Sequence, residues 1–399
     1  MKTNVIDFRK TQSDEKPPSK FIKFLRTSSD EDLKKMYKIL GYKYINDVVP
    51  KYETPVEQYN IPFWYDLPNF ECVKERWGIF NIYFDSDENI KEFEKKLNMK
   101  FQGKSGWYPT KPRYSGDTWI TEKPQNPKYP IFIISKGRWE KRWTQKALEE
   151  MKVDYKIVIE PQEYDNYVEH IPSEKILILP NEYLNKNQGS IPVRNFIWEY
   201  SKKQGHKRHW CLDDNIDGFY RFHKNARIKV KSGVCFKVLE DYTDRFSNVG
   251  LTGMNYFMFC PDISKRRLLA QVNTRVYSCI LIDNSLPERW RGTYNEDTDL
   301  SLRLLKRGVP TLLFNMFLCN KKTTMTCKGG NTDTIYKDDG LEKKTMSLVN
   351  QHPDCVKKTF KFGKIHHQVD YRGFKNNELK VKPDQYFSKN FNEYTMKLI

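Results

Sequence analysis

From residue 128 onward, short apolar runs alternate with helical segments, and this alternation restricts the fold more than any other feature. The runs P-I-F-I-I, Y-K-I-V-I-E and H-W-C-L are short and end in polar residues or Gly, as buried parallel strands do. Helical patterns lie between them, at T-Q-K-A-L-E-E-M and after Q-G-S-I-P. Strands that alternate with helices predict right-handed βαβ units and a mostly parallel sheet with flanking helices. We therefore expect an α/β fold.

A smaller unit precedes this region. Residues 1–30 are polar and charged, and we interpret them as a flexible basic arm. Residues 31–123 contain a capped helix, a strand over 78–84 and a second helix with acids in its first turn, so they predict a small α+β accessory domain. We place the main domain at 128–375. A basic tail at 376–399 is expected on the surface or on DNA.

The charge of the chain narrows the choice of partners. Lys and Arg total 69 against 51 Asp and Glu, which gives a formal net charge of +18. Such an excess attracts polyanions, so nucleic acid or a nucleotide is expected, although a basic surface could also serve solubility alone. Residues 104–114 mix aromatic, basic and proline residues. They could stack on bases and pair with phosphates, or form a linker packed on the next domain.

We expect a soluble, cytoplasmic protein. Its eight cysteines show neither a C-x-x-C pair nor zinc-like spacing, which fits a reducing compartment. The N-terminus lacks the apolar region of a signal peptide. No segment approaches the roughly 20 apolar residues that cross a bilayer, so no membrane partner is expected.

Polar residues stand where the expected strands end. In W-C-L-D-D-N the strand ends at Asp213 and Asp214, while Ser135, Arg138 and Glu160 follow two other strands. In parallel sheets, ligands bind at the carboxyl ends of the strands. Two carboxylates there could hold a divalent cation that neutralises a diphosphate. They could also be the polar residues of a turn or a helix cap.

Two further motifs flank this pair of carboxylates. Upstream, G-S-I-P-V-R-N places Arg194 on the element that leads into the carboxylate strand. Downstream, Y-N-E-D-T-D-L-S-L-R places Glu296 and Asp297 at the start of a helix that ends at Gly308. An acid at that position could compensate the helix dipole or point into the cleft as a general base. Each motif is common by itself, whereas the ordered set is far more specific.

In this order the motifs resemble the nucleotide-sugar-dependent glycosyltransferases of GT-A fold, particularly those of the family 2 type. A closer resemblance is to the TET-associated glycosyltransferases of phages. It covers about residues 128–375 and rests on six stretches: P-I-F-I-I-S-K-G-R-W, E-P-Q-E-Y-D-N-Y, Q-G-S-I-P-V-R-N, H-W-C-L-D-D-N-I, Y-N-E-D-T-D-L-S-L-R and K-G-G-N-T-D.

The resemblance implies a GT-A domain that moves a sugar from a UDP-sugar to the hydroxymethyl group of a 5-hydroxymethylpyrimidine in phage DNA, 5-hydroxymethylcytosine above all. It implies functional coupling to a TET-like dioxygenase that installs the hydroxyl, and a place in the host cell cytoplasm if a phage encodes the chain. A base in duplex DNA must leave the stack to reach such a site.

The resemblance also implies a metal site for Mn²⁺ or Mg²⁺. Asp214 would ligate the ion that bridges the donor diphosphate, and Asp213 would hold the ribose or the same ion. Asn215 stands where many relatives keep the last acid of a D-x-D motif, so the division of the metal among these three residues stays open. His366 and His367 could supply a further ligand, although a structural histidine is more common.

Other roles follow from the same resemblance. Asp297 would take the proton from the acceptor hydroxyl as it attacks the anomeric carbon, and a single displacement would invert the anomeric configuration. Glu296 would contact the acceptor or orient its neighbour. Arg138 could instead be a surface residue. Four residues lie where such enzymes contact the donor: Ser135, Arg138, Glu160 and Arg194.

Two other functions fit the same sequence. One is a glycosyltransferase that acts on a protein or glycan acceptor, against which a salt-dependent affinity for duplex DNA would argue. The other is a non-catalytic DNA-binding module on a degenerate transferase fold, against which slow hydrolysis of a UDP-sugar would argue. The presence of Asp213, Asp214 and Asp297 together favours the enzyme.

Overall fold

A computed structural model describes most of the chain in two compact units. The smaller unit comprises residues 1–57, 71–116 and 263–266, and the larger unit comprises the rest. The described residues are 4–10, 15–27, 30–42, 56–57, 61–72, 78–109, 117–186, 188–224, 226–260, 268–322, 340–361, 363–383 and 390–399. The motif K-G-G-N-T-D and residues 110–114 of the aromatic and basic segment lie outside them.

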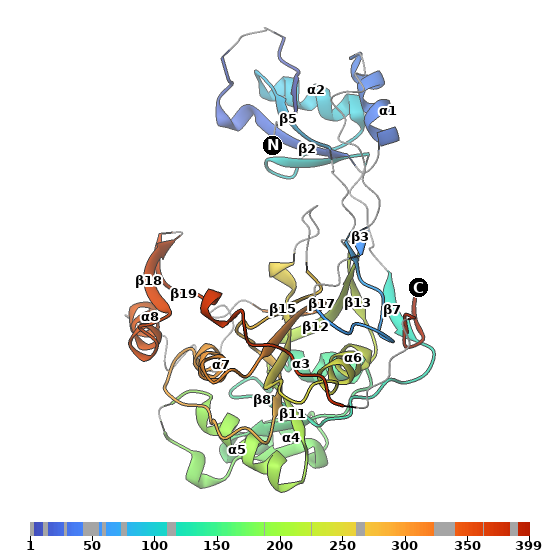
Figure 1. Ribbon diagram of the computed structural model, residues 1–399. Helices are drawn as coiled ribbons and strands as arrows, with labels where there is room; N and C mark the ends of the chain where they lie inside the picture. The colour runs from blue at the N-terminus through green and yellow to red at the C-terminus, as the bar shows by residue number, and fades with distance from the viewer. Residues whose placement is uncertain are drawn as a thin grey trace. The chain divides into compact units, whose positions relative to one another are not determined.

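The smaller unit is a four-stranded sheet whose helices share one apolar cluster with it. Leu25, Phe80 and Phe93 are fully buried in this cluster. The strands follow the order β1 (Asn4–Asp7), β5 (Gly78–Tyr83), β2 (Ile22–Thr27) and β6 (Ser105–Tyr108), and the helices are α1 (Asp30–Leu40) and α2 (Asp87–Leu97) (Figure 1). A short pair, β3 (Val56–Glu57) and β4 (Glu71–Cys72), stands apart from this sheet.

Strands β1 and β2 contradict the interpretation of residues 1–30 as a flexible arm. Ile6 and Leu25 are 5% and 0% exposed, because each points from its strand into the apolar cluster. Each strand also pairs with β5 through backbone hydrogen bonds. Burial of these apolar side chains stabilises the segment despite the charged residues around them.

The larger unit is built on a sheet of twelve strands in the described part of the chain. Eleven strands follow the order β10 (Ile176–Ile178), β9 (Lys156–Ile159), β8 (Ile131–Ile134), β11 (Arg208–Asp213), β16 (Cys279–Asp283), β14 (Leu251–Tyr256), β17 (Thr311–Lys321), β12 (Ile216–His223), β13 (Ala226–Val230), β7 (Thr118–Thr121) and β20 (Met396–Leu398), and β15 (Ala270–Val272) pairs with β17. The flanking helices are α3 (Trp143–Glu150), α4 (Tyr164–Val168), α5 (Ile191–Lys203), α6 (Val234–Thr243), α7 (Glu296–Lys306) and α8 (Gly340–Gln351).

The expectation of a mostly parallel sheet was wrong. Strands β10, β9, β8 and β11 run parallel, but β16 runs antiparallel to both β11 and β14. A parallel pair needs a long crossover, usually a helix, whereas a short turn joins antiparallel strands. Strands β12 and β13, which only two residues separate in the chain, form such an antiparallel pair. The sheet is therefore mixed.

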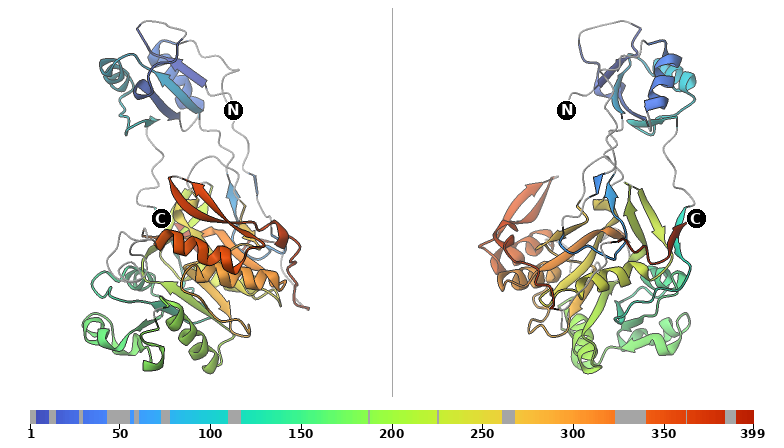
Figure 2. Two further views of the ribbon diagram at one scale, coloured as in Figure 1. Left: turned by 90° about the vertical axis from the view of Figure 1, so that its left-hand side faces the viewer. Right: turned by 45° about the vertical axis from the view of Figure 1, so that its right-hand side comes forward.

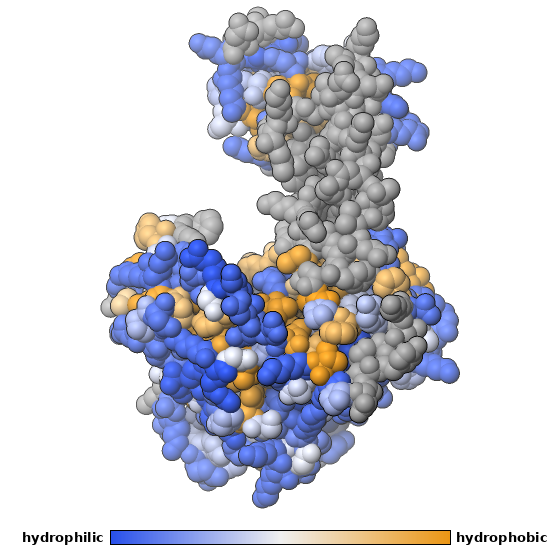
Figure 3. Space-filling view, viewed as in Figure 1, coloured by the Kyte–Doolittle hydropathy of each residue, from blue (hydrophilic) through white to orange (hydrophobic). Residues whose placement is uncertain are grey.

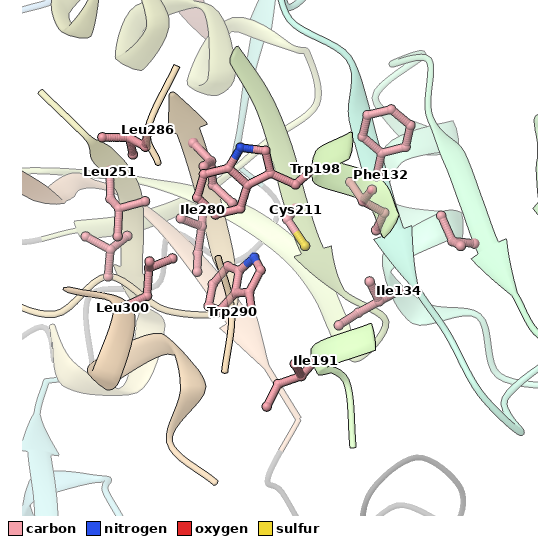
Figure 4. Packing of buried hydrophobic residues seen from close by; sticks show 14 of the residues in the cluster. Phe132, Ile134, Ile191, Trp198, Cys211, Leu251, Ile280, Leu286, Trp290 and Leu300 are labelled. Atoms are coloured by element: carbon pink, nitrogen blue, oxygen red, sulfur yellow. The ribbon is translucent and has the colours of Figure 1, made fainter. Parts of the chain in front are cut away.

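The apolar core seats α5 and α7 against the sheet. Trp198 of α5 and Trp290 meet edge to face, with ring centroids 6.4 Å apart, beside Cys211 of β11 and Ile280 of β16 (Figure 4). Leu300 of α7 belongs to the same buried cluster. Because α5 precedes β11 and runs back along it, this packing sets the beginning of α5 at the carboxyl end of that strand.

The last residues of the chain pack on the larger unit. Strand β20 pairs antiparallel with β7, so both extend the large sheet. Glu393 forms an ion pair with buried Arg221 at 2.7 Å, and the Tyr394 hydroxyl donates to Asp241 at 2.8 Å. The described residues of the expected tail at 376–399 therefore lie on the surface but contact the larger unit. These contacts also move the start of the larger domain ahead of residue 128, because β7 belongs to its sheet.

Two simpler expectations concern cysteines and membranes. Six cysteines of the described segments are free thiols: Cys211, Cys235, Cys260, Cys279, Cys319 and Cys355. Within those same segments, no helix has the length and apolar character needed to span a membrane.

A buried ion cluster holds the first turns of α7. Asp299 is fully buried, and its carboxylate accepts hydrogen bonds from Arg291 Nη2 at 2.9 Å and from Arg303 Nε at 2.8 Å. His352 Nε2 lies 2.9 Å from the same carboxylate. Burial alone would raise the pKa of Asp299, but the hydrogen bonds from His352 and Arg291 and the charge of Arg303 outweigh it and lower the pKa to about 2. The cluster thus links α7 to the end of α8.

We predict that Asp299→Asn lowers the free energy of unfolding by about 2 kcal/mol at neutral pH, because each unit of pKa shift is worth about 1.4 kcal/mol. The folded pKa of about 2 lies below the ordinary value of 3.8, so this stabilisation is present above pH 3.8 and is lost as the pH falls towards 2. Urea unfolding at neutral pH and at about pH 3 measures both limits. Asp154→Asn, at a fully exposed carboxylate, is the control and should change little. A deficit of Asp299→Asn that does not depend on pH would contradict the role of the charge.

Candidate active site

A cavity of about 790 Å³ lies where β8, β9 and β11 end and where α5 and α7 begin. This volume is typical of sites for small molecules. The cavity brings together nearly all the residues that the sequence indicated. Those on its wall are Ser135, Arg138, Glu160, Arg194, Asp213, Asp214, Asn215, Glu296, Asp297 and His367.

The two histidines that were expected as possible metal ligands, His366 and His367, point to opposite sides of one strand. They belong to β19 (Lys364–Val369), which pairs with β18 (Val356–Lys361) and packs on α8 (Figure 2). Neighbouring residues of a strand point to opposite sides, so His367 lines the cavity while His366 is exposed away from it. Burial, with the nearby charges of Arg275 and Lys344, lowers the pKa of His367 to about 4 and keeps it neutral at physiological pH. His366 is therefore no part of the site.

Asp213 lies between two cations. Its Oδ1 accepts a hydrogen bond from Arg194 Nη2 at 2.7 Å, and its Oδ2 accepts one from Lys321 Nζ at 2.6 Å. Burial would raise the pKa of Asp213, but the charges of Lys321 and Arg194 outweigh it and hold that pKa well below the ordinary value. The Asp213 carboxylate is therefore ionised and joins α5 to the end of β17.

Both carboxylate oxygens of Asp214 also have partners within the protein. Its Oδ1 pairs with Arg138 Nη1, and its Oδ2 accepts a hydrogen bond from Ser135 Oγ at 2.9 Å. Burial raises the pKa of Asp214, and Arg138 and Ser135 oppose this increase. The Arg138 side chain is only 10% exposed, so it is not a surface residue. Ser135 is held in turn by the Tyr167 hydroxyl at 2.6 Å.

This donor set does not fit a divalent cation. All four oxygens of Asp213 and Asp214 already accept a hydrogen bond, three of them from a cation. Asn215 Oδ1 is buried and accepts none within the described chain, but it is a neutral amide oxygen, whereas Mg²⁺ or Mn²⁺ is usually bound through one or two carboxylates beside water and substrate phosphates. Where the structure describes the chain, one group of three His, Cys, Asp or Glu ligands converges within 4.8 Å, and it lies elsewhere, at His352, Asp354 and Cys355.

Arg194 is a buried residue that links the Asp213 and Glu296 carboxylates of the site. Its side chain is 4% exposed, and its guanidinium lies 4.8 Å from the centre of the Trp290 ring. Burial works against the charge of Arg194, but the carboxylates of Asp213 and Glu296 outweigh it and raise the pKa. Arg194 is thus committed to contacts within the protein.

Glu296 and Asp297 start α7 but point to different neighbours. Glu296 Oε1 accepts a hydrogen bond from Ser190 Oγ at 3.0 Å and lies 3.6 Å from Arg194 Nε, so Glu296 ties α7 to α5. Asp297 Oδ1 accepts from the backbone N–H of Thr298 at 2.7 Å. No described residue donates to Asp297 Oδ2, which leaves this oxygen available on the cavity wall.

Asp217, the second residue of β12, contacts the end of β17. Its Oδ1 accepts a hydrogen bond from Asn320 at 2.6 Å, and its Oδ2 lies 2.5 Å from Lys322 Nζ. It therefore braces the end of β17, next to the residues that face the cavity.

Sequence patterns missed several residues of the cavity. Asn320 and Lys321 follow nine buried residues of β17, and this change from a mainly apolar run to polar and charged residues was the available signal. Arg275 gave no local signal. Glu163, outside the wall, accepts a hydrogen bond from Gly137 N–H at 2.7 Å, and burial raises its pKa to about 7. Further additions on the wall include Tyr256, Tyr277, Ser278, Lys343 and Lys344.

The wall of the cavity is basic overall. Eight Lys and Arg residues line it against five Asp and Glu residues. Hydrophilic residues also cover much of the surface on the side of α8 and the β18–β19 hairpin (Figure 3). A cavity with this charge balance can hold an anion, and the free oxygen of Asp297 can accept a proton beside it.

One comparison with known proteins gives a match, and it covers most residues of this site. Residues 129–330 match the family model described as TET-Associated Glycosyltransferase. That range holds β8 to β17 and with them the paired Asp213 and Asp214, Glu296, Asp297 and Lys321. No curated protein matches the chain significantly. Because the match covers just over half of its residues, the chain belongs to the TET-associated glycosyltransferase family.

Proposed function

We propose that the protein is an inverting glycosyltransferase of GT-A fold that moves a sugar from a UDP-sugar to a 5-hydroxymethylpyrimidine in DNA, 5-hydroxymethylcytosine above all. One observation carries this proposal. A single cavity, most of whose wall lies in the region matched by the family, holds both a basic wall and a carboxylate with a free oxygen. These are the two elements that transfer from a nucleoside diphosphate donor needs.

The donor nucleoside is proposed to lie over the ends of β8 and β9. There the wall includes the apolar side chains of Val158, Leu179 and Tyr183, with Glu160 among them. The Glu160 carboxylate is held by Lys136 Nζ at 2.6 Å and can accept hydrogen bonds from a ribose. This placement directs the diphosphate towards β17 and the sugar towards Asp297.

Asp297 is proposed to act as the general base. The acceptor hydroxyl attacks the anomeric carbon while its proton passes to Asp297 Oδ2, and the bond from that carbon to the diphosphate oxygen breaks. Attack from the face opposite the leaving group inverts the anomeric configuration. Glu296 is a positioning residue, because its carboxylate is already engaged by Ser190 and Arg194.

The acceptor is proposed to be DNA, because the family is TET-associated and the chain carries a net charge of +18. A TET-like dioxygenase would supply the hydroxymethyl group on the base. Lys343 and Lys344 of α8 line the cavity and can meet the phosphates that flank the reacting nucleotide. A base reaches such a cavity only after it leaves the stack, which costs least in single-stranded DNA.

The smaller unit is proposed to bind the same DNA. Phe24 of β2 is 37% exposed beside a small cavity of about 150 Å³, whose wall also includes Lys16, Lys104 and Asn81. An exposed ring among lysines can stack on a base while the ammonium groups meet phosphates.

The proposed activity predicts a heavier nucleoside after incubation of the protein with UDP-sugars and DNA that contains 5-hydroxymethylcytosine. Mass spectrometry of the digested DNA measures the added hexose. Unmodified DNA is the control, since it lacks the hydroxyl that attacks. Failure with every common UDP-sugar, on hydroxymethylated cytosine and uracil alike, would refute the proposed acceptor and donor.

The assignment of the base predicts that Asp297→Asn lowers the transfer rate by roughly 10²- to 10⁴-fold, since the amide cannot take the proton. UDP affinity should stay close to that of the wild type. Glu296→Gln is the matched comparison, because its amide oxygen can still accept from Ser190, so it should lose far less activity. Single-turnover rates at saturating donor measure both variants. If Glu296→Gln loses more than Asp297→Asn, Glu296 is the base.

The role of the smaller unit predicts that Phe24→Ala weakens binding of single-stranded DNA by roughly 5- to 100-fold, as expected for the loss of one stacked base. Fluorescence anisotropy with a labelled oligonucleotide measures the effect. Ile39→Ala, at a side chain 47% exposed on α1, is the matched control. Equal affinities of the two variants would exclude Phe24 from the interface.

A further inference from the structure

We propose that Lys321 and Arg275 neutralise the donor diphosphate, so that the enzyme needs no divalent cation. The inference rests on the proposed function and names the groups that stabilise its leaving group. It starts from the paired oxygens of Asp213 and Asp214, which leave no place for an ion between them. An ion on Asp213 would also stand beside the Lys321 ammonium, a like charge.

Lys321 is held in place by two hydrogen bonds and keeps a third N–H donor. Its ammonium donates to Asp213 Oδ2 at 2.6 Å and to Ser278 Oγ at 2.8 Å, and it lies 5.7 Å from the centre of the Tyr256 ring. An ammonium has three N–H donors, and no third acceptor lies among the described residues. The third N–H therefore serves a ligand in the cavity that Lys321 lines.

Asp213 has the task of placing this ammonium. Its other oxygen is fixed by Arg194, which is itself buried against Trp290. A lysine side chain loses considerable rotamer freedom when it binds a ligand, and an ammonium fixed beforehand avoids that cost. Asp213 is thus a positioning residue for a cation of the protein, and it need not ligate a metal.

Arg275 supplies the second charge. Its guanidinium lines the cavity and lies 4.9 Å from the centre of the Tyr277 ring. No carboxylate among the described residues forms an ion pair with it, and none of them accepts its N–H donors. A half-buried guanidinium with no described carboxylate within ion-pair distance is suited to bind a phosphate by two parallel hydrogen bonds.

The two cations act where charge develops during transfer. When the bond between the anomeric carbon and the diphosphate oxygen breaks, its electron pair leaves with the diphosphate, which gains one negative charge. Lys321 and Arg275 donate N–H bonds to the phosphate oxygens and stabilise this charge. The acceptor proton goes to Asp297, so atoms and charges balance without another reactant.

The test measures UDP binding by isothermal titration calorimetry in excess EDTA and in MnCl₂. Wild-type protein should bind UDP with the same Kd in both buffers. Lys321→Ala and Arg275→Ala should each weaken binding roughly 10- to 100-fold in both, as expected for the loss of a hydrogen bond between charged groups. Lys322→Ala is the matched control, since this neighbouring lysine pairs with Asp217 at 2.5 Å and does not line the cavity.

Two variants distinguish a loss of UDP binding from a loss of the folded structure. Lys321→Ala leaves Asp213 with one cation and can destabilise the fold, whereas Arg275→Ala removes a side chain that pairs with no described acid. Lys321→Arg keeps the charge and should recover part of the UDP affinity. The transfer rate of wild-type protein should also be equal in EDTA and in MnCl₂.

Binding and transfer that appear only with MnCl₂ would overturn this inference and leave the proposed function standing. Arg275→Ala and Lys321→Ala that bind UDP like Lys322→Ala would overturn it as well. If wild-type protein binds no UDP in either buffer, the proposed donor is wrong and the inference falls with it.

Discussion

The bridge from Asp213 to Arg194 and Lys321 is the interaction on which the rest of the site depends. It joins three segments that the chain brings together from distant positions, α5, the end of β11 and the end of β17. Buried charges are costly unless they are paired, so each member needs the other two. The same need fixes their geometry, because both distances are within hydrogen-bond length. The position of the cavity wall follows from this charge balance.

The apolar core makes that bridge possible. Arg194 lies over Trp290, and Trp290 meets Trp198 edge to face in the cluster that seats α5 on the sheet. The Asn195 side chain fixes the Trp290 backbone through two hydrogen bonds of 2.9 Å. A guanidinium held on both sides loses little further freedom when the site is used. Packing and electrostatics are therefore coupled here, and a cavity in this core would also misplace the charges.

Local patterns predicted the elements that carry the site, because strands β8, β9 and β11 and helices α5 and α7 each show their own periodicity. The contacts that residues of these elements make with distant parts of the chain were harder to predict. Lys321 reaches Asp213 across 108 residues of sequence, and no local pattern records such a contact. The resemblance pointed to a metal on the same carboxylates for this reason: sequence shows the acids but not the cations that pair with them. The mixed order of the sheet escaped prediction likewise, since strand pairing is not local.

The adjacent acids Glu296 and Asp297 show where sequence reasoning must stop and geometry begin. Successive residues of a helix differ by about 100° in direction, so two adjacent carboxylates point in different directions. At the start of α7 this rotation turns Glu296 to Ser190 and Arg194 and leaves Asp297 on the cavity wall with a free oxygen. Glu296 and Asp297 carry the same chemical group, and only the position of α7 in the fold distinguishes their roles. The position of α7 depends on buried Asp299, two residues further along the helix, whose partners include Arg291 and His352 from outside the motif and Arg303 at its end.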